Sequence, residues 1–471
     1  MKKTKIALAL LLATATSSQL LATNGYFSHG VSAKDKGRAG AAAAIGTDAF
    51  ASANNPANLL QVGERLEAGI SFFSPIRSYK ITGEPSLSAG FTPVIGGFPG
   101  CAQPGVAPCQ IPFSTNVQEI DSDKEFFPIP SFAWATQLSS TSAFGVAVYG
   151  NGGMNTEYNG GSARVFDPNT NAIVDAPGTF GAGKTGIDLI QLFINTTYAF
   201  EASDQLDLGV SVIAVMQAFE ATGLAAFANI SEDAENLTNN GHDVSYGVGI
   251  KVGATFSVTD EFSIGLSYQS EIDMTEFDDY AGLFAEKGNF DIPATYIIGF
   301  AWKTSATSTL MVDFQKIMYS DIPAIANTIS PITSGQCFDA LNSTLFAGGT
   351  PTPASGAGCL GGSAGAGFGW NDVSVIKIGY EWKLGKDTMR LGYSTNDQPI
   401  DSSEVNFNLL APGVVEDHFT VGYTLVQDEN EWDFFFMYAP EVKVSGTSQF
   451  DPAQTIEFKM HQFEAGFSYK F

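Results

Sequence analysis

The side chains that could perform acid–base, nucleophilic or metal chemistry are few in this chain of 471 residues. Its four histidines are His29, His242, His418 and His461, and none of them begins an HExxH motif. A triad of His461 with a serine and an acid finds no support in the spacing of these residues. The acidic clusters at 121–123 and 276–279 lack the spacing of an EF-hand loop. The sequence therefore predicts a protein that is not an enzyme, with no catalytic residue, no cofactor and no metal site.

The cysteines fall into two local pairs. Cys101 and Cys109 lie in one segment rich in proline and glycine, and Cys337 and Cys359 lie in another. Four cysteines allow three pairings, and the two local pairings close the shortest loops. We therefore predict the disulfides Cys101–Cys109 and Cys337–Cys359. A four-ligand zinc site would need closer spacing than these pairs have.

The charge balance excludes one class of partner. The chain has 49 acidic and 23 basic residues and a formal net charge of -26, so binding to nucleic acid through its phosphates is excluded. Only 15% of the residues are charged, while glycine occurs 50 times and phenylalanine 37 times. Cytosolic enzymes have about a quarter charged residues, so this composition indicates another environment.

Residues 1–22 have the layout of a secretory signal peptide. Three lysines within the first five residues precede an apolar run over 6–13, which is too short to span a bilayer. Small residues follow this run, so we predict cleavage after Ala22, with Ala15 as the alternative. The mature protein is therefore expected to be exported.

The rest of the chain alternates between apolar and polar residues. No apolar run of 18 residues follows the signal peptide, so no transmembrane helix is predicted. Over 244–256 every second residue is apolar and the others are glycine, serine, threonine or lysine, a period that is typical of strands. This pattern predicts fourteen strands near 64–76, 126–138, 143–153, 185–200, 205–220, 243–258, 261–273, 292–303, 308–319, 373–384, 388–396, 416–426, 431–441 and 456–471.

Two features favour a membrane barrel over a soluble β-sandwich. The polar faces consist of glycine and small polar residues, while apolar faces end in aromatics such as Tyr380 and Trp382. Six connections are short and seven are long, as in barrels with periplasmic turns and extracellular loops. The last strand ends on Phe471, which resembles the signal that the barrel-assembly machinery recognises. We therefore predict an all-β fold, a 14-stranded antiparallel transmembrane β-barrel over residues 64–471.

Residues 23–63 do not alternate and are expected to form a compact unit. The segment is rich in small residues and contains Lys34, Lys36 and Arg38. A barrel of fourteen strands is too wide for its wall side chains to fill, so it is either water-filled or plugged. Because no linker separates the segment from the first strand, we expect an N-terminal hatch, or plug, inside the lumen rather than a periplasmic tail.

Short motifs in a fixed order carry a resemblance. In the predicted hatch these are 24–27, 37–44 and 55–57, and further along the chain 152–155, 313–316 with 319–321, 369–372, 397–400, 410–412 with 416–418, and 437–440. Each motif is weak alone, but their order is jointly specific. The chain resembles the FadL-type family of outer-membrane transporters for long-chain fatty acids and hydrocarbons.

The resemblance implies a mechanism. Family members are plugged fourteen-stranded barrels that move hydrophobic molecules without an energy source. A ligand is caught among extracellular loops, passes to a pocket in the lumen, and leaves sideways into the bilayer through a kink in the third strand. Movement of the hatch N-terminus couples the pocket to this exit. The resemblance implies ligand-pocket or hatch roles for Tyr26, Phe27, His29, Arg38, Asn55, Pro56 and Ala57.

The residues suggest where such a mechanism would act. Gly150, Gly152 and Gly153 weaken the third strand and favour a bulge, which makes them a candidate lateral gate unless they merely start the following loop. Apolar side chains in two long loops could form a capture groove, or could simply pack together. These side chains are Leu224, Phe227, Ile230, Leu283 and Phe284.

A carboxylate headgroup in the lumen would require a cation. By strand parity Lys251, Lys377 and Arg390 face inward, although inward-facing acids make ordinary salt bridges the competing interpretation.

The sequence thus predicts passive transport of hydrophobic small molecules, with long-chain fatty acids as the first prediction. Aromatic or aliphatic hydrocarbons are the alternative substrate, and a general water-filled porin is the rival class. The expected partners are the hydrophobic ligand, outer-membrane lipids and lipopolysaccharide. The protein is expected to be a monomer in the outer membrane of a Gram-negative bacterium.

Overall fold

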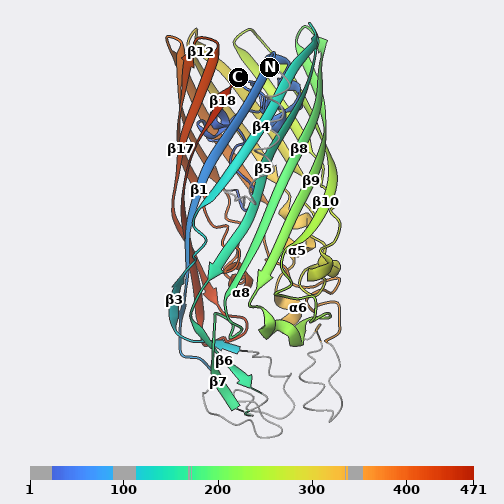
Figure 1. The fold of residues 1–471 in the computed structure, drawn as a ribbon, viewed down its shortest axis with the longest axis vertical. Helices are drawn as coiled ribbons and strands as arrows, with labels where there is room; N and C mark the ends of the chain where they lie inside the picture. Colours follow the sequence, from blue (N-terminus) through green and yellow to red (C-terminus); the bar gives the residue numbers. More distant parts are fainter. Residues whose placement is uncertain (1–23, 88–112, 168–169, 171, 335, 338–353) are drawn as a thin grey trace.

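The computed structural model describes residues 24–87, 113–167, 170, 172–334, 336–337 and 354–471. The predicted signal peptide and the pair Cys101 and Cys109 lie outside these residues. Fourteen antiparallel strands form a closed barrel, in which each strand pairs with its neighbours along the chain and β1 pairs with β18 (Figure 1). The strands are β1 (Arg65–Thr82), β4 (Phe127–Ser139), β5 (Ser142–Tyr158), β8 (Thr185–Ser203), β9 (Leu206–Thr222), β10 (Asp243–Ser257), β11 (Phe262–Gln269), β12 (Thr295–Ser305), β13 (Ser308–Ile317), β14 (Val373–Leu384), β15 (Asp387–Asn396), β16 (Asp417–Gln427), β17 (Asn430–Thr447) and β18 (Thr455–Lys470).

The two faces of the wall follow the alternation in the sequence. In β10, the side chains of Val248 and Ile250 are 65% and 53% exposed, while Ser245 and Lys251 on the opposite face are buried. Exposed apolar side chains recur around the outside of the barrel on nearly every strand. The barrel therefore has an apolar exterior, and its polar face points into the lumen.

The strands differ from the predicted ones mainly at the loop end. β5 continues to Tyr158 and β17 to Thr447, beyond the predicted ends at 153 and 441, and β11 ends at Gln269, before 273. Beyond the bilayer neither face has to meet lipid, so the alternation no longer marks where pairing stops.

The loops contain further short elements that the sequence pattern did not predict. β2 (Phe113–Thr115), β6 (Ser162–Asp167) and β7 (Ala172–Pro177) form a separate three-stranded sheet, and β3 (Gln118–Asp121) pairs with the end of β1. The loop helices are η2 (Ala225–Ile230), η3 (Asp278–Tyr280), α4 (Ala285–Gly288), η4 (Tyr319–Asp321), α5 (Pro323–Ala326), α6 (Ser330–Thr333) and α8 (Val405–Asn408). The C-terminus lies at the opposite end of the barrel (Figure 1). Within the described ranges, no helix is long and apolar enough to cross a membrane.

The segment before β1 fills the barrel interior as a hatch. It contains α2 (Ala33–Lys36), α3 (Ala51–Asn54) and η1 (Pro56–Gln61), and its residues are almost all buried. Ion pairs join it to the wall, because Lys36 contacts Glu464 of β18 and Lys34 contacts Glu431 of β17. The Asp313 carboxylate of β13 accepts hydrogen bonds from the N–H groups of Ala42 and Ala43, at 2.7 and 2.9 Å.

Wall glycines allow the hatch to approach closely. A Cβ atom added to Gly253 would overlap the Asn55 side chain, and one added to Gly265 would overlap the Ala43 carbonyl group. A Cβ atom added to Gly392 would likewise overlap backbone atoms of the hatch. The lumen is therefore filled by close packing of the hatch against the strands, rather than by water around a loose segment.

Candidate functional site

A bulge interrupts β5 at the predicted glycines. The register between β5 and β8 shifts between Gly150 and Gly152, so Asn151 is the extra residue. On its other side, β5 pairs with β4 only as far as Val148, opposite Phe132. Beyond this point the two strands separate, and the wall has no continuous ladder between them.

The hatch N-terminus occupies the inner side of this separation. The N–H of Ser28 donates to the Asn151 carbonyl at 2.8 Å, and the N–H of Gly153 donates to the Tyr26 carbonyl at 3.1 Å. A Cβ atom at Gly152 would overlap the Tyr26 carbonyl oxygen. Glycine at this position is therefore required for the hatch to lie against the bulge.

An aromatic cluster connects the hatch N-terminus to the loops. Tyr26 and Phe27 are buried, and the Tyr26 ring lies 5.3 Å from that of Tyr319 and 6.2 Å from that of Trp370. The Trp370 indole N–H donates to Asn408 Oδ1 at 2.6 Å, which links this cluster to α8. Tyr319 and Trp370 belong to the sequence motifs that carried the resemblance, but they were not predicted as site residues. Their position among loop motifs was the only available signal.

The other predicted hatch residues do not gather with Tyr26 and Phe27. The His29 ring stacks on His418 of β16, with 5.9 Å between centroids, and Arg38 donates to Asp35 at 2.9 Å. Asn55, with Pro56 and Ala57 beside it, contacts the wall at β10, three strands away from β5. The hatch set is therefore divided between the bulge in β5, the wall at β14 and β16, and the wall at β10.

The loops form an apolar pocket that includes most of the predicted groove residues. Leu224 and Phe227 from one predicted loop and Leu283 and Phe284 from the other line it together, whereas Ile230 is buried outside its lining. The remaining lining residues are Ile187, Phe219, Ala324, Leu360, Ala366, Gly367, Phe368, Phe407 and Leu410. They come from strands and from two later loops, and the sequence offered no sign that these segments meet here. The pocket leaves about 30 Å³ of open volume, so its side chains nearly fill it.

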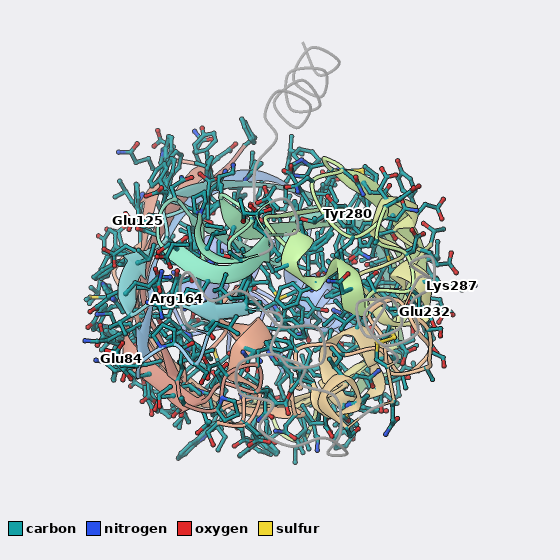
Figure 2. All side chains as sticks on the ribbon, turned by 90° about the horizontal axis from the view of Figure 1, so that it is seen from below. Glu84, Glu125, Arg164, Glu232, Tyr280 and Lys287 are labelled. Atoms are coloured by element: carbon teal, nitrogen blue, oxygen red, sulfur yellow. A yellow bond between two sulfur atoms is a disulfide. The ribbon has the colours of Figure 1, made fainter. Side chains whose placement is uncertain are left out.

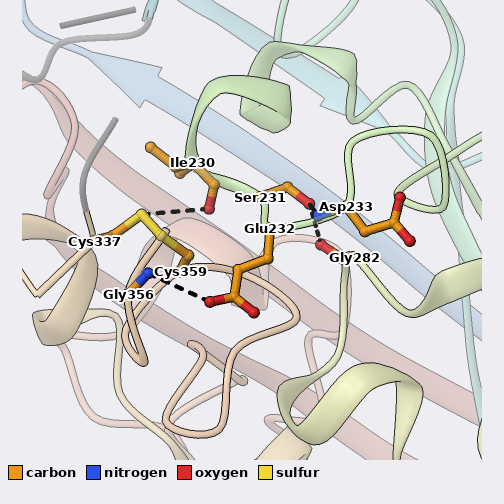
Figure 3. Close-up of a disulfide and its surroundings, with 8 residues drawn as sticks. All are labelled: Ile230, Ser231, Glu232, Asp233, Gly282, Cys337, Gly356 and Cys359. Atoms are coloured by element: carbon orange, nitrogen blue, oxygen red, sulfur yellow. Dashed lines mark hydrogen bonds between the residues drawn. A yellow bond between two sulfur atoms is a disulfide. The ribbon is translucent and has the colours of Figure 1, made fainter. Parts of the chain in front are cut away.

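The disulfide Cys337–Cys359 is confirmed (Figure 3). It lies beside this pocket, because Leu360, next to Cys359, belongs to the pocket lining. The residue after Cys359 is Leu360, whose N–H donates to the Ile230 carbonyl at 2.9 Å. The N–H of Gly356 donates to the Glu232 carboxylate at 3.3 Å. The disulfide therefore closes the loop that contributes Leu360, and the hydrogen bonds at Leu360 and Gly356 hold this loop against the loop that contains η2.

The three predicted headgroup cations have different surroundings. Arg390 donates to the Glu381 carboxylate at 3.2 Å and is therefore ion-paired. Lys377 donates to the His29 carbonyl at 3.1 Å, and Lys251 donates to the Ala53 carbonyl. Both lysines are buried, and within the described ranges neither has a carboxylate at ion-pair distance.

The loop rim is charged, whereas the pocket is apolar. Seen from the loop end, Glu84 and Lys287 lie toward opposite sides of the rim (Figure 2). His242 lies 3.3 Å from Asp188 and 3.3 Å from Glu220, and its hydrogen bond to Asp188 raises the pKa of the imidazole. The carboxylates of Glu271, Asp273 and Asp291 lie within 4.8 Å of one another, but Asp291 already accepts the Met274 N–H at 2.7 Å.

The fold is similar to those of several solved outer-membrane transporters over nearly the whole chain. A FadL homologue of Pseudomonas aeruginosa matches at a TM-score of 0.61 and 15% identity, covering 95% of this chain and 99% of that one. The toluene transporter TodX of P. putida matches at a TM-score of 0.59 and 16% identity. The toluene transporter TbuX of Ralstonia pickettii matches at a TM-score of 0.55 and 17% identity. Each of these two matches covers 94% of this chain and 98% of the other. No curated protein matches the sequence.

A closed barrel with a packed hatch and an apolar loop pocket defines a class, the outer-membrane channels for hydrophobic compounds. Residues 13–469 match the family described as outer membrane protein transport protein (OMPP1/FadL/TodX), and the chain belongs to this family. It is a transporter of the bacterial outer membrane that carries hydrophobic compounds, and it is not an enzyme.

Proposed function

We propose that this protein passively transports long-chain fatty acids from the cell exterior into the outer membrane. The observation that carries the proposal is the loop pocket, whose thirteen lining residues are all apolar or glycine. An apolar pocket at the loop end provides what an acyl chain needs to leave water, because burying each CH₂ group contributes about 0.8 kcal/mol.

The route leads from this pocket through the lumen to the bulge in β5. Phe227 and Phe284 receive the apolar chain, and displacement of Tyr26 and Phe27 opens a way to the separation between β4 and β5. The ligand then leaves sideways through Gly150, Gly152 and Gly153 into the bilayer. Support comes from the hydrogen bonds that hold the hatch N-terminus at this bulge.

The substrate class rests on separate observations. Among the described residues, the buried cations Lys251 and Lys377 donate hydrogen bonds only to backbone carbonyls, which favours a ligand with a carboxylate. Uncharged aromatic or aliphatic hydrocarbons are the second candidate, favoured by the absence of a charged side chain in the pocket lining. A water-filled porin is disfavoured, because the hatch is packed against the wall.

Reconstitution tests the proposal. Purified protein in liposomes should admit radiolabelled palmitate but no sugar in a swelling assay, whereas sugar permeation would refute the plugged channel. Phe284→Ala should weaken palmitate binding on the order of tenfold, because an aromatic wall of the pocket is lost. Phe419→Ala, on the lipid-facing surface, is the matched control and should bind normally. If the protein binds hexadecane or toluene tightly but does not bind palmitate, uncharged hydrocarbons are its substrates instead.

A further inference from the structure

Arg77 is a buried cation in the wall at the level of the β5 bulge. It lies on β1, its side chain faces the lumen, and it is 4% exposed. One terminal nitrogen donates to the Asn155 carbonyl, and the other donates to the Lys124 carbonyl at 3.3 Å. Its Nε is buried and has no hydrogen-bond partner among the described residues.

Arg77 differs in its ion pairing from the other arginines of the chain. All five arginines lie in the described ranges, and four have a carboxylate within ion-pair distance. These pairs are Arg38–Asp35, Arg65–Glu67, Arg164–Asp175 and Arg390–Glu381. Among the described residues, no carboxylate lies within this distance of Arg77. Glu125 and Asp188 act on Arg77 from beyond ion-pair distance, but its hydrogen bonds go to neutral carbonyls, so an anion would offset the remaining desolvation cost.

The side chain lines a small pocket between the bulge and the hatch. Gly25 of the hatch, Gly153 and Asn155 of β5, and Trp370 share this lining with Arg77. The open volume is about 20 Å³, so a carboxylate group could enter only if the hatch segment at Gly25 moved aside.

Apolar side chains continue from the charged end of the pocket. Phe73, Met154 and Met460 belong to the same lining. A guanidinium beside aromatic and thioether side chains matches an amphiphile that has one anionic group and an apolar chain.

We propose that Arg77 binds the carboxylate of a fatty acid at the β5 bulge, and that it distinguishes anionic from uncharged ligands on the exit path. This inference rests on the proposed transport function. Lys251 and Lys377 favour an anionic ligand by their charge, but each already donates to a hatch carbonyl, at Ala53 and His29, so the bound carboxylate is assigned to Arg77.

Binding measurements on matched ligands test this assignment. Palmitate and hexadecanol share an acyl chain and differ in charge, so equilibrium binding of both to wild type, Arg77→Gln and Arg77→Lys isolates the contribution of the carboxylate. Arg77→Gln should weaken palmitate binding about tenfold to a hundredfold, the range for a charge-assisted hydrogen bond, and hexadecanol binding less than about twofold. Arg77→Lys should retain part of the preference for palmitate. Lys80→Gln removes an exposed charge from the same strand and should leave both ligands unaffected.

The outcomes separate this inference from the proposed function. Unchanged palmitate binding in Arg77→Gln, or equal losses for both ligands, would overturn the role of Arg77 while transport of hydrophobic ligands stands. Wild-type protein that binds neither ligand would overturn the proposed function. If Arg77→Gln does not fold, a structure of the wild type with bound palmitate tests whether Arg77 binds the carboxylate. The carboxylate is expected within hydrogen-bond distance of Arg77, and a carboxylate placed at Lys251 or Lys377 contradicts the assignment.

Discussion

The hydroxyl of Tyr319 donates a hydrogen bond to the Asn24 carbonyl at 2.6 Å. The same oxygen accepts the N–H of Tyr26 at 3.2 Å. Tyr319 belongs to η4, directly after β13, whereas Asn24 is the first described residue of the hatch. The Tyr319 side chain thus holds the Asn24 carbonyl and the Tyr26 N–H, the two backbone groups on either side of Gly25. A Cβ atom at Gly25 would lie 2.7 Å from the Tyr319 ring.

Tyr319→Phe should release the hatch N-terminus without affecting the barrel. The substitution removes both hydrogen bonds and leaves the buried Tyr26 N–H unpaired, at a cost of about 1–3 kcal/mol, while the Asn24 carbonyl keeps the Phe27 N–H at 3.3 Å. Hydrogen exchange at residues 26–28 should become at least about tenfold faster, while exchange in β8 and β9 stays the same. Tyr423→Phe removes an exposed hydroxyl contact with Asp387 and is the control. Unchanged exchange at residues 26–28 would mean that other contacts hold this segment.

Gly152→Ala should displace the hatch N-terminus from the bulge. The added Cβ overlaps the Tyr26 carbonyl oxygen, which belongs to backbone and has little freedom to move. We expect a folded barrel with reduced palmitate uptake and fast exchange at the Gly153 amide, which has lost its acceptor. Val148→Ala, earlier on the outer face of β5, should transport like wild type. Normal uptake by both Gly152→Ala and Gly152→Val would argue against an exit at this bulge.

Removing the disulfide should loosen the wall of the loop pocket. The bond closes a sequence separation of 22 residues, for which chain entropy predicts a stabilisation of about 3 kcal/mol. In Cys337→Ser/Cys359→Ser, the Leu360 amide should exchange about a hundredfold faster, because its hydrogen bond to Ile230 opens more often. Palmitate binding should weaken several-fold. The same changes on reduction of the wild type would confirm the cause, and an unchanged Leu360 amide would contradict it.

The contact of His242 with Asp188 and Glu220 should depend on pH. The pKa of folded His242 is raised, principally by its hydrogen bond to Asp188, above an unfolded value of about 6.5. Its stabilising effect is therefore fully present below about pH 6.5 and is lost as the pH rises through the folded pKa. Hydrogen exchange at 239–243, corrected for intrinsic rates, should be faster in His242→Gln than in wild type at about pH 5.5 and equal at about pH 9. His461→Gln is the control, and a difference that persists at the higher pH would refute the ionic origin.

Alternation predicted the barrel wall because lipid imposes a period of two on every strand that crosses the membrane. The predicted strand at 373–384 coincides with β14, and most other ends agree within a few residues. The prediction fails outside the membrane, where β2, β3, β6 and β7 form. There the residues meet water or other loops, so their pattern carries no periodic constraint.

The site was predictable only where local sequence determines it. Three glycines in four residues weaken a strand in any context, and the bulge lies among them. The contribution of Phe407 and Leu410 to the loop pocket depends on how distant loops meet, which no local pattern encodes. Ion pairing is equally non-local, because strand parity places Arg390 in the lumen but does not reveal that Glu381 neutralises it.

The close contacts between hatch and wall have a consequence for variation in this protein. Gly209, Gly253, Gly265 and Gly392 lie on four different strands, and each leaves space for the hatch. The lumen surface is therefore shaped to one particular path of the chain before β1. A hatch transplanted from a relative at 15% identity would fit only if the wall residues facing it were exchanged as well. Hatch and wall are thus expected to change together, as one inherited unit.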